Sequence, residues 1–158
     1  MIVYVKNKFF SLKGSSTVKD DAGRDVFTVK GKLFSATKKK FVCSLAGKPL
    51  YTVRNKFFHL FVHSVFVSDE NGEKIARVKH PPFSPKKFVV EGYKDEITVD
   101  GDFFSFKSTI TRGGVPIGTI TREFDIVDAF KLEAEPEDIP FLIALIIGID
   151  NITDKMKK

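Results

Sequence analysis

Residues 53–58 read Val-Arg-Asn-Lys-Phe-Phe, and variants of this segment recur along the chain. The recurring segments are KNKFF at Lys6, KGKLF at Lys30, RNKFF at Arg54, KHPPF at Lys79, DGDFF at Asp100 and TREFD at Thr121. Their starts lie 24, 24, 25, 21 and 21 residues apart. Each start directly follows an aliphatic β-branched residue, namely Val5, Val29, Val53, Val78, Val99 and Ile120. Spacing this regular indicates an internal repeat of one structural unit.

Turn signals about midway through the units predict that each unit forms a hairpin. Four of them are found at residues 20–23 (DDAG), 46–49 (AGKP), 69–72 (DENG) and 112–114 (RGG), with Gly or Asn available where a turn needs positive φ. Short β-rich runs flank them, at residues 41–45 and 50–53, 64–67 and 75–78, and 108–111 and 117–121. Two short strands around a tight turn form a hairpin, so six units predict about a dozen antiparallel strands.

The number of strands favours a closed barrel with a filled interior. A unit of 21–25 residues is shorter than a propeller blade, and an open sheet of a dozen strands would leave exposed edges. Closure removes the edges, but side chains fill the interior of only about eight strands. The run Phe141–Ile149, FLIALIIGI, is apolar on all sides and follows the acidic and proline-containing residues 133–140. We therefore expect a buried helix at about residues 137–152 that fills the barrel, with Ile146→Asp preventing stable folding. A β-trefoil is the alternative fold, and it leaves the apolar run unexplained.

Length and cysteine content limit the class of protein. A chain of 158 residues suits one domain, which we place at residues 1–158. Cys43 is the single cysteine, so no intramolecular disulfide can form, and its apolar surroundings predict a buried thiol.

The first ten residues do not resemble a signal peptide, and the nine apolar residues of Phe141–Ile149 are fewer than the roughly 20 of a membrane span. We expect a monomer in the cytoplasm, with peripheral attachment to a membrane as one option.

Several of these features together resemble one known family. They are the K-x-K-F-F-S segments, GKLFS in the second unit, the DENG turn, DGDFFSF in the fifth unit and the C-terminal apolar run that ends in Ile-Asp. The chain resembles the LURP-one-related proteins, which belong to the Tubby C-terminal-domain-like superfamily with the tubby proteins and phospholipid scramblases. The resemblance implies a twelve-stranded antiparallel barrel around a central hydrophobic helix. It also implies a link to lipids, although the tubby and scramblase functional motifs do not match residue by residue.

The charge is distributed unevenly, which points to an anionic partner. Residues 1–79 contain 16 Lys/Arg and 6 Asp/Glu, whereas residues 80–158 contain 10 and 14. The first three repeat segments place cations at equivalent positions, and residues two apart on a strand share a face. The candidate anion- and lipid-binding residues are Lys6, Lys8, Lys30, Lys32, Lys38, Lys39, Lys40, Arg54 and Lys56. The competing interpretation is a surface that confers solubility and prevents strand edges from pairing.

These residues predict a non-enzymatic module that binds anionic phospholipid or phosphoinositide headgroups. Clustered cations contribute about 1 kcal/mol each to attraction toward an anionic membrane. Replacing Lys38–Lys40 by Glu should then abolish binding and leave the fold intact. The alternatives are a protein-interaction or structural module without a lipid ligand and, less favoured, a nucleic-acid-binding protein.

The remaining polar and aromatic patterns favour structural roles. We expect the recurring large apolar residues to pack in a shared core, namely Phe9, Phe10, Leu33, Phe34, Phe57, Phe58, Phe83, Phe103, Phe104 and Phe124.

His59 and His63 have no third ligand at a suitable spacing, and His80 stands alone, so we expect no metal site. Asp100 and Asp102 indicate an acidic surface strand rather than a catalytic pair, and neither a nucleophile elbow nor a phosphate loop is present. We expect no catalytic residues and no cofactor. The two prolines Pro81 and Pro82 predict an edge, bulge or loop in the fourth unit.

Overall fold

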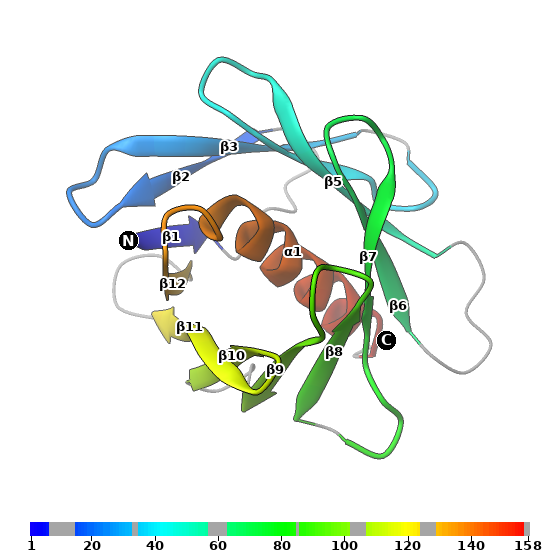
Figure 1. The fold of residues 1–158 in the computed structure, drawn as a ribbon. Coiled ribbons are helices and arrows are strands. Elements are labelled where there is room, and N and C mark those ends of the chain that lie inside the picture. The colour runs from blue at the N-terminus through cyan, green and yellow to red at the C-terminus, as the bar shows by residue number, and fades with distance from the viewer. Residues whose placement is uncertain are drawn as a thin grey trace.

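Twelve antiparallel strands close into a barrel around one helix. The computed structural model describes residues 1–6, 15–32, 35–56, 63–84, 86–101, 107–123 and 129–156, with side chains up to Thr153. The elements are β1 Ile2–Lys6, β2 Ser15–Asp20, β3 Asp25–Gly31, β4 Lys40–Cys43, β5 Pro49–Asn55, β6 Ser64–Ser68, β7 Lys74–Lys79, β8 Lys87–Glu91, β9 Ile97–Gly101, β10 Lys107–Arg112, β11 Val115–Glu123, β12 Ala129–Ala134 and α1 Ile139–Met156. Each strand pairs with its neighbours in sequence, and β1 pairs with β12 to close the barrel (Figure 1). This confirms the predicted barrel of twelve strands.

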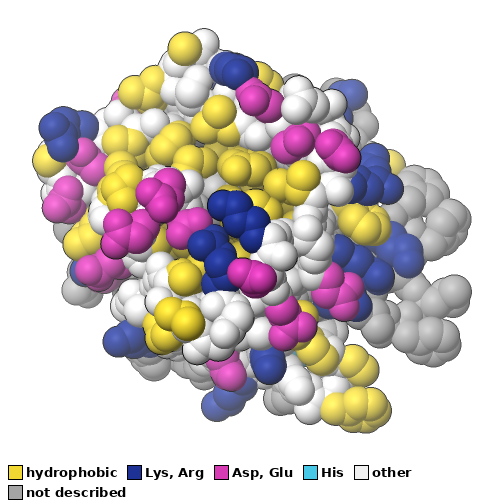
Figure 2. Space-filling model, viewed as in Figure 1, with side chains coloured by type: hydrophobic (Ala, Val, Ile, Leu, Met, Phe, Trp, Pro, Cys, Tyr) yellow, Lys and Arg dark blue, Asp and Glu magenta, His cyan; other side chains and the backbone are white. Residues whose placement is uncertain are grey.

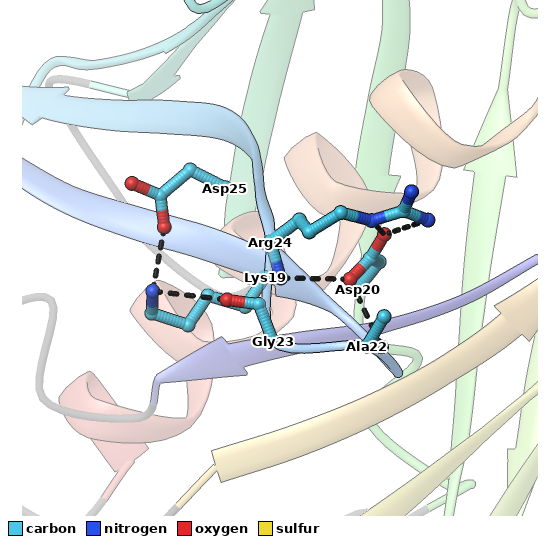
Figure 3. Close-up of polar contacts among 6 residues, drawn as sticks. All are labelled: Lys19, Asp20, Ala22, Gly23, Arg24 and Asp25. Carbon is cyan, nitrogen blue, oxygen red and sulfur yellow. Dashed lines mark hydrogen bonds and ion pairs between the residues drawn. The ribbon is translucent and has the colours of Figure 1, made fainter.

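The β2–β3 turn shows how a short polar sequence forms a tight hairpin. Asp20 Oδ1 accepts hydrogen bonds from the backbone N–H groups of Ala22 (3.0 Å) and Arg24 (2.9 Å), and Arg24 Nε donates to Oδ2 at 2.8 Å (Figure 3). Gly23 has a φ of 76°, which a residue with a Cβ rarely adopts. The Asp20 side chain therefore replaces hydrogen bonds that water would otherwise supply, and it fixes the path of the turn.

The same geometry recurs in the next two hairpins, which confirms three of the predicted turns. Ser44 and Asp69 occupy the place of Asp20, and Asp69 Oδ1 accepts from the N–H groups of Asn71 and Glu73, both at 2.9 Å. Gly47 and Gly72 have φ angles of 84° and 81°. The fourth predicted turn, at residues 112–114, joins β10 to β11. The β8–β9 turn, residues 92–96, was not predicted because its only glycine stands among charged residues.

Apolar side chains from every strand line the interior, and in all strands except β12 they include Val or Ile. The residue before each repeat segment is buried, with Val5, Val29, Val53, Val78, Val99 and Ile120 at most 2% exposed. Side chains alternate between the two faces of a strand, so the next residue, the first of each segment, points outward. A helix with side chains is about 10–12 Å across and leaves room for only a thin layer of wall side chains. Valine meets this constraint and also favours the strand conformation.

Helix α1 occupies the interior and is buried on all sides. It extends over Ile139–Met156, whereas the sequence predicted residues 137–152, so it begins two residues later and ends four residues later. Ile139 and residues 141–149 are buried, and α1 packs most closely on β5 and β6. The acidic residues precede the helix rather than occupying its first turn. Among the described residues, no helix combines the length and the hydropathy that a membrane-spanning segment needs.

Phe83 corrects the prediction that the recurring aromatic residues share a core. The described part of the fourth unit forms a loop between β7 and β8, as its two prolines predicted, and Phe83 in this loop is 95% exposed. Proline cannot donate to a strand ladder, so the segment leaves the sheet before its Phe can turn inward. The other recurring positions (Phe9, Phe10, Leu33, Phe34, Phe57, Phe58, Phe103, Phe104 and Phe124) lie outside the described residues.

Candidate functional site

The up-and-down topology gives the barrel two ends that differ in sequence. The tight turns β2–β3, β4–β5, β6–β7, β8–β9 and β10–β11 lie at one end, together with the start of α1. The six longer connections, from the end of each odd-numbered strand to the next even-numbered strand, lie at the other end. The chain visits both ends in every repeat unit. Residues distant in sequence therefore meet at one end.

Cations predominate at the end formed by the longer connections, which we call the basic end. Its described residues include ten cations and two carboxylates outside the interior, and Lys6, Lys32, Lys56, Lys86 and Lys107 among the cations are exposed. We define the basic end by Lys6, Lys32, Lys38, Lys39, Arg54, Lys56, Lys86, Lys87, Lys107, Arg122, Asp100 and Glu123.

Carboxylates predominate at the end formed by the tight turns, which we call the acidic end. We define it by Asp20, Asp21, Asp25, Asp69, Glu70, Glu73, Asp95, Glu96, Glu133, Glu135, Glu137 and Asp138 with the cations Lys19, Arg24, Lys48, Lys74, Lys94 and Arg112. Four ion pairs link charges within it: Lys19–Asp25 at 2.6 Å, Arg24–Asp20 at 2.8 Å, Lys48–Glu70, and Arg112–Asp138 at 2.6 Å. Figure 2 shows Lys and Arg side chains near the middle of the visible face, with groups of Asp and Glu side chains around them.

Hydrogen bonding at the acidic end stabilises the Asp20 carboxylate in the charged form. The pKa of Asp20 is lowered, first because its carboxylate accepts a hydrogen bond from the Arg24 backbone N–H and also because of the Arg24 side chain. The pKa of Arg112 is raised, chiefly by its hydrogen bond to Asp138. The cations of this end therefore neutralise part of its negative charge locally.

The structure brings six of the nine predicted site residues together at the basic end. Lys6, Lys32 and Lys56 are exposed, and Lys38, Lys39 and Arg54 are half-buried. Lys6 and Arg54 each follow an inward-facing valine and therefore point outward, Lys6 on β1 and Arg54 on β5. These two strands are four positions apart in the barrel, so at about 4.8 Å per strand the two residues are separated by about 19 Å along the barrel wall. Lys8 lies outside the described residues.

The structure places Lys30 and Lys40 away from this outward-facing group. Lys30 lies on β3, and its ammonium is close enough to Gly47 that a Cβ there would lie 3.5 Å from Nζ, so it approaches the β4–β5 turn at the acidic end. Lys40 is 6% exposed because it shares the inward face of β4 with Val42, and its Nζ donates to Asn151 Oδ1 of α1 at 3.0 Å. The expectation that Lys38–Lys40 can all be replaced by Glu with the fold intact stays untested, and the burial of Lys40 argues against including that residue.

Sequence reasoning missed the cations that the second half of the chain contributes. Lys86, Lys87, Lys107 and Arg122 lie at the basic end, although residues 80–158 carry a negative net charge. The repeat itself held the signal, because positions that follow equivalent segments lie at the same end of the barrel. The charge is segregated by barrel end, and the comparison of two halves of the sequence obscured this.

The other candidate residues are dispersed. Cys43 is buried, and burial raises the pKa of its thiol. The His80 ring is buried with its centroid 5.0 Å from that of Phe88, whereas His63 is half-buried and His59 lies outside the described residues. Asp100 is exposed on β9, and Asp102 lies outside the described residues. Within the described ranges, no three His, Cys, Asp or Glu residues are grouped as a metal site would require.

Comparison with known proteins identifies the family. The model of the LURP-one-related family matches residues 1–150. The chain belongs to the LURP-one-related family. The match extends from β1 through most of α1, so it covers both the barrel and the helix of this LURP-one-related chain. No curated protein and no solved structure matched the chain.

Proposed function

We propose that this LURP-one-related chain is a non-enzymatic module that binds anionic phospholipid headgroups at a membrane surface through its basic end. The observation that carries the proposal is the segregation of charge between the two barrel ends. The basic end contains ten cations and two carboxylates among its described residues, whereas carboxylates outnumber cations at the acidic end. An anionic surface attracts the first end and repels the second, so the segregation favours one orientation of the barrel on a membrane.

The magnitude of this attraction supports binding by several residues acting together. One Lys or Arg near an anionic membrane contributes about 1 kcal/mol, which is too little alone to hold a protein. Five exposed lysines at one end contribute about 5 kcal/mol if all reach the surface. Salt screens such contacts over a Debye length of about 8 Å at physiological ionic strength, so binding should weaken steeply as salt is added.

Cosedimentation with vesicles tests the proposal. The protein is mixed with vesicles of phosphatidylcholine alone, with added phosphatidylserine, or with added phosphoinositide, at low and physiological salt. We expect binding to both anionic compositions that survives physiological salt, and none to phosphatidylcholine. Replacing three exposed lysines of the basic end (Lys32→Glu, Lys56→Glu and Lys86→Glu) should lower the affinity at least about 100-fold, since three contributions of about 1 kcal/mol are lost.

A matched variant separates a local site from an effect of net charge. The variant Lys48→Glu, Lys74→Glu and Lys94→Glu changes the net charge by the same amount, but its three exposed residues lie at the acidic end. It should retain most of the affinity. Equal losses in the two variants, or no binding of the parent to anionic vesicles, would contradict the proposal. A gel shift with RNA or DNA that is stronger than vesicle binding would favour the nucleic-acid alternative.

A further inference from the structure

Phe83 is the most exposed large hydrophobic side chain of the described residues. It is 95% exposed, compared with 63% for Val115, 58% for Leu45 and 42% for Met1. Single apolar residues on a surface are common, so exposure alone implies nothing. What distinguishes Phe83 is where the fold places it and how the loop holds it.

A hydrogen-bonded turn presents the Phe83 ring to solvent. The Ser84 N–H donates to the Pro81 carbonyl at 3.2 Å, which closes a four-residue turn with Pro82 and Phe83 at its two central positions. Proline at the first central position fixes φ near the value that such turns require. The Gly101 N–H donates to the Lys86 carbonyl at 3.0 Å and ties the end of the loop to β9. Phe83 therefore lies at the tip of a constrained loop.

The position of Phe83 in the barrel separates it from the other exposed hydrophobic residues. Val115 and Leu45 lie at or beside tight turns, and the amino group of Met1 donates to the Ala134 carbonyl, so all three belong to the acidic end. Among the described residues, Phe83 is thus the one large, exposed hydrophobic side chain at the basic end. Lys86 and Lys87 follow it in the same loop and at the start of β8.

We propose that Phe83 inserts into the outer part of an anionic bilayer while Lys86 and the other basic-end cations contact the lipid phosphates. The inference rests on the proposed function, and it identifies the residue that would enter the membrane. Aromatic rings favour the boundary between headgroups and acyl chains, and flanking cations favour anionic lipid. The constrained loop lowers the entropic cost of presenting the ring to the bilayer.

The chain contains no tryptophan, so a single Phe83→Trp substitution supplies a fluorescent probe at this position. The variant is mixed with phosphatidylcholine–phosphatidylserine vesicles, with and without brominated acyl chains. We expect a blue shift of the emission on binding and strong quenching by the brominated lipid. Leu45→Trp, at the opposite end, is the matched control and should show neither change when the same vesicles are bound.

The outcomes distinguish this inference from the proposed function. If Phe83→Trp cosediments with the vesicles and is not quenched, insertion is wrong and electrostatic binding stands. If the parent does not bind anionic vesicles, both fail. Phe83→Ala should lower the vesicle affinity about ten-fold, equivalent to about 1.4 kcal/mol, and Phe83→Leu should restore most of it. Unchanged affinity of Phe83→Ala would also overturn the inference.

Discussion

At the acidic end of the barrel an ion pair and stacked rings hold helix α1, whereas at the basic end a hydrogen bond from a buried lysine holds it. The Arg112 guanidinium pairs with Asp138, directly before the helix, at 2.6 Å. The Tyr93 ring stacks on Phe141 with centroids 3.7 Å apart, and Tyr51 meets Phe141 edge-on at 5.7 Å. These contacts close the interior at the start of the helix.

The interior at the basic end is polar. Lys40 donates to Asn151, and Thr153 Oγ1 donates to the Asp150 carbonyl at 3.0 Å. Asn55 is 3% exposed, and neither atom of its side-chain amide has a hydrogen-bond partner among the described residues. Buried polar atoms without partners cost about 1–3 kcal/mol each. Arg112 Nε at the acidic end is one such atom, against the two amide atoms of Asn55 at the basic end, so we expect the basic end to be held less firmly.

The prediction with the largest expected loss of stability concerns helix α1, which extends between the two ends of the barrel. Ile146→Asp places a carboxylate in the middle of α1, where the parent side chain is fully buried. A buried charge without a partner costs several kcal/mol, comparable to the whole stability of a domain, so the variant should not fold. Circular dichroism and urea titration measure this. Ile146→Val, the control, should lose about 1 kcal/mol. A folded Ile146→Asp with the parent midpoint would show that α1 is not buried.

The second largest loss of stability is expected when the ion pair between Arg112 and Asp138 at the acidic end is removed. Arg112→Ala leaves the buried Asp138 carboxylate without its guanidinium, and the stability should fall by about 2–3 kcal/mol. Lys48→Ala removes an ion pair between two exposed side chains at the same end and should cost less than about 0.5 kcal/mol. Urea unfolding of both variants gives the comparison. Similar losses would mean that the anchor at the start of the helix does not depend on burial.

A smaller loss of stability is expected when the hydrogen bond between Lys40 and Asn151 at the basic end is removed. Lys40→Ala leaves the buried Asn151 Oδ1 without the Lys40 donor and should destabilise the protein by about 1–2 kcal/mol in the same urea assay. Lys32→Ala, an exposed neighbour at this end, should change stability by less than about 0.5 kcal/mol. If the comparison is correct, Lys40→Ala costs less than Arg112→Ala. The reverse order would make the basic end the firmer anchor.

The smallest effect is a pH dependence that belongs to the acidic end. Burial, and then the neighbouring Tyr93, raise the pKa of Tyr51 from 10.0 to about 12. The folded state therefore keeps this proton more tightly than the unfolded state does. The resulting stabilisation is complete below pH 10 and is lost as the pH rises toward 12. Urea midpoints measured between pH 9 and 12 should fall more steeply for the parent than for Tyr51→Phe. Parallel curves would show that Tyr51 titrates normally.

Sequence reasoning predicted the barrel well because the decisive signals are local. Glycines with positive φ fixed the turns, and the Val or Ile before each repeat segment marked the inward face of a strand. The recurrence of Phe was misleading at Phe83 because the two prolines before it take the chain out of the sheet. A pattern of residue types cannot show that one member of the set has left the sheet.

The candidate site was only partly predictable. Position in the repeat placed Lys6, Lys32 and Lys56 at one end, but Lys40 belongs to the same run of three lysines as Lys38 and Lys39 and points into the interior. Its direction depends on the register of β4 against β5, in which Lys40 lies opposite Val53. A shift of one residue would have reversed it.

The amino-acid sequence by itself determined the strand count, four of the five tight turns and the buried helix, since alternation, glycine turns and an apolar run act over a few residues. The tertiary structure alone decided which charges share an end, that Lys40 donates to the helix, and that Phe83 lies at the end of the barrel that carries cations from distant units. The up-and-down order of the strands places the six longer connections at one end, and closure brings β1 against β12 so that these connections form a ring. The surface that results is a property of that closure, because no single repeat unit contains it.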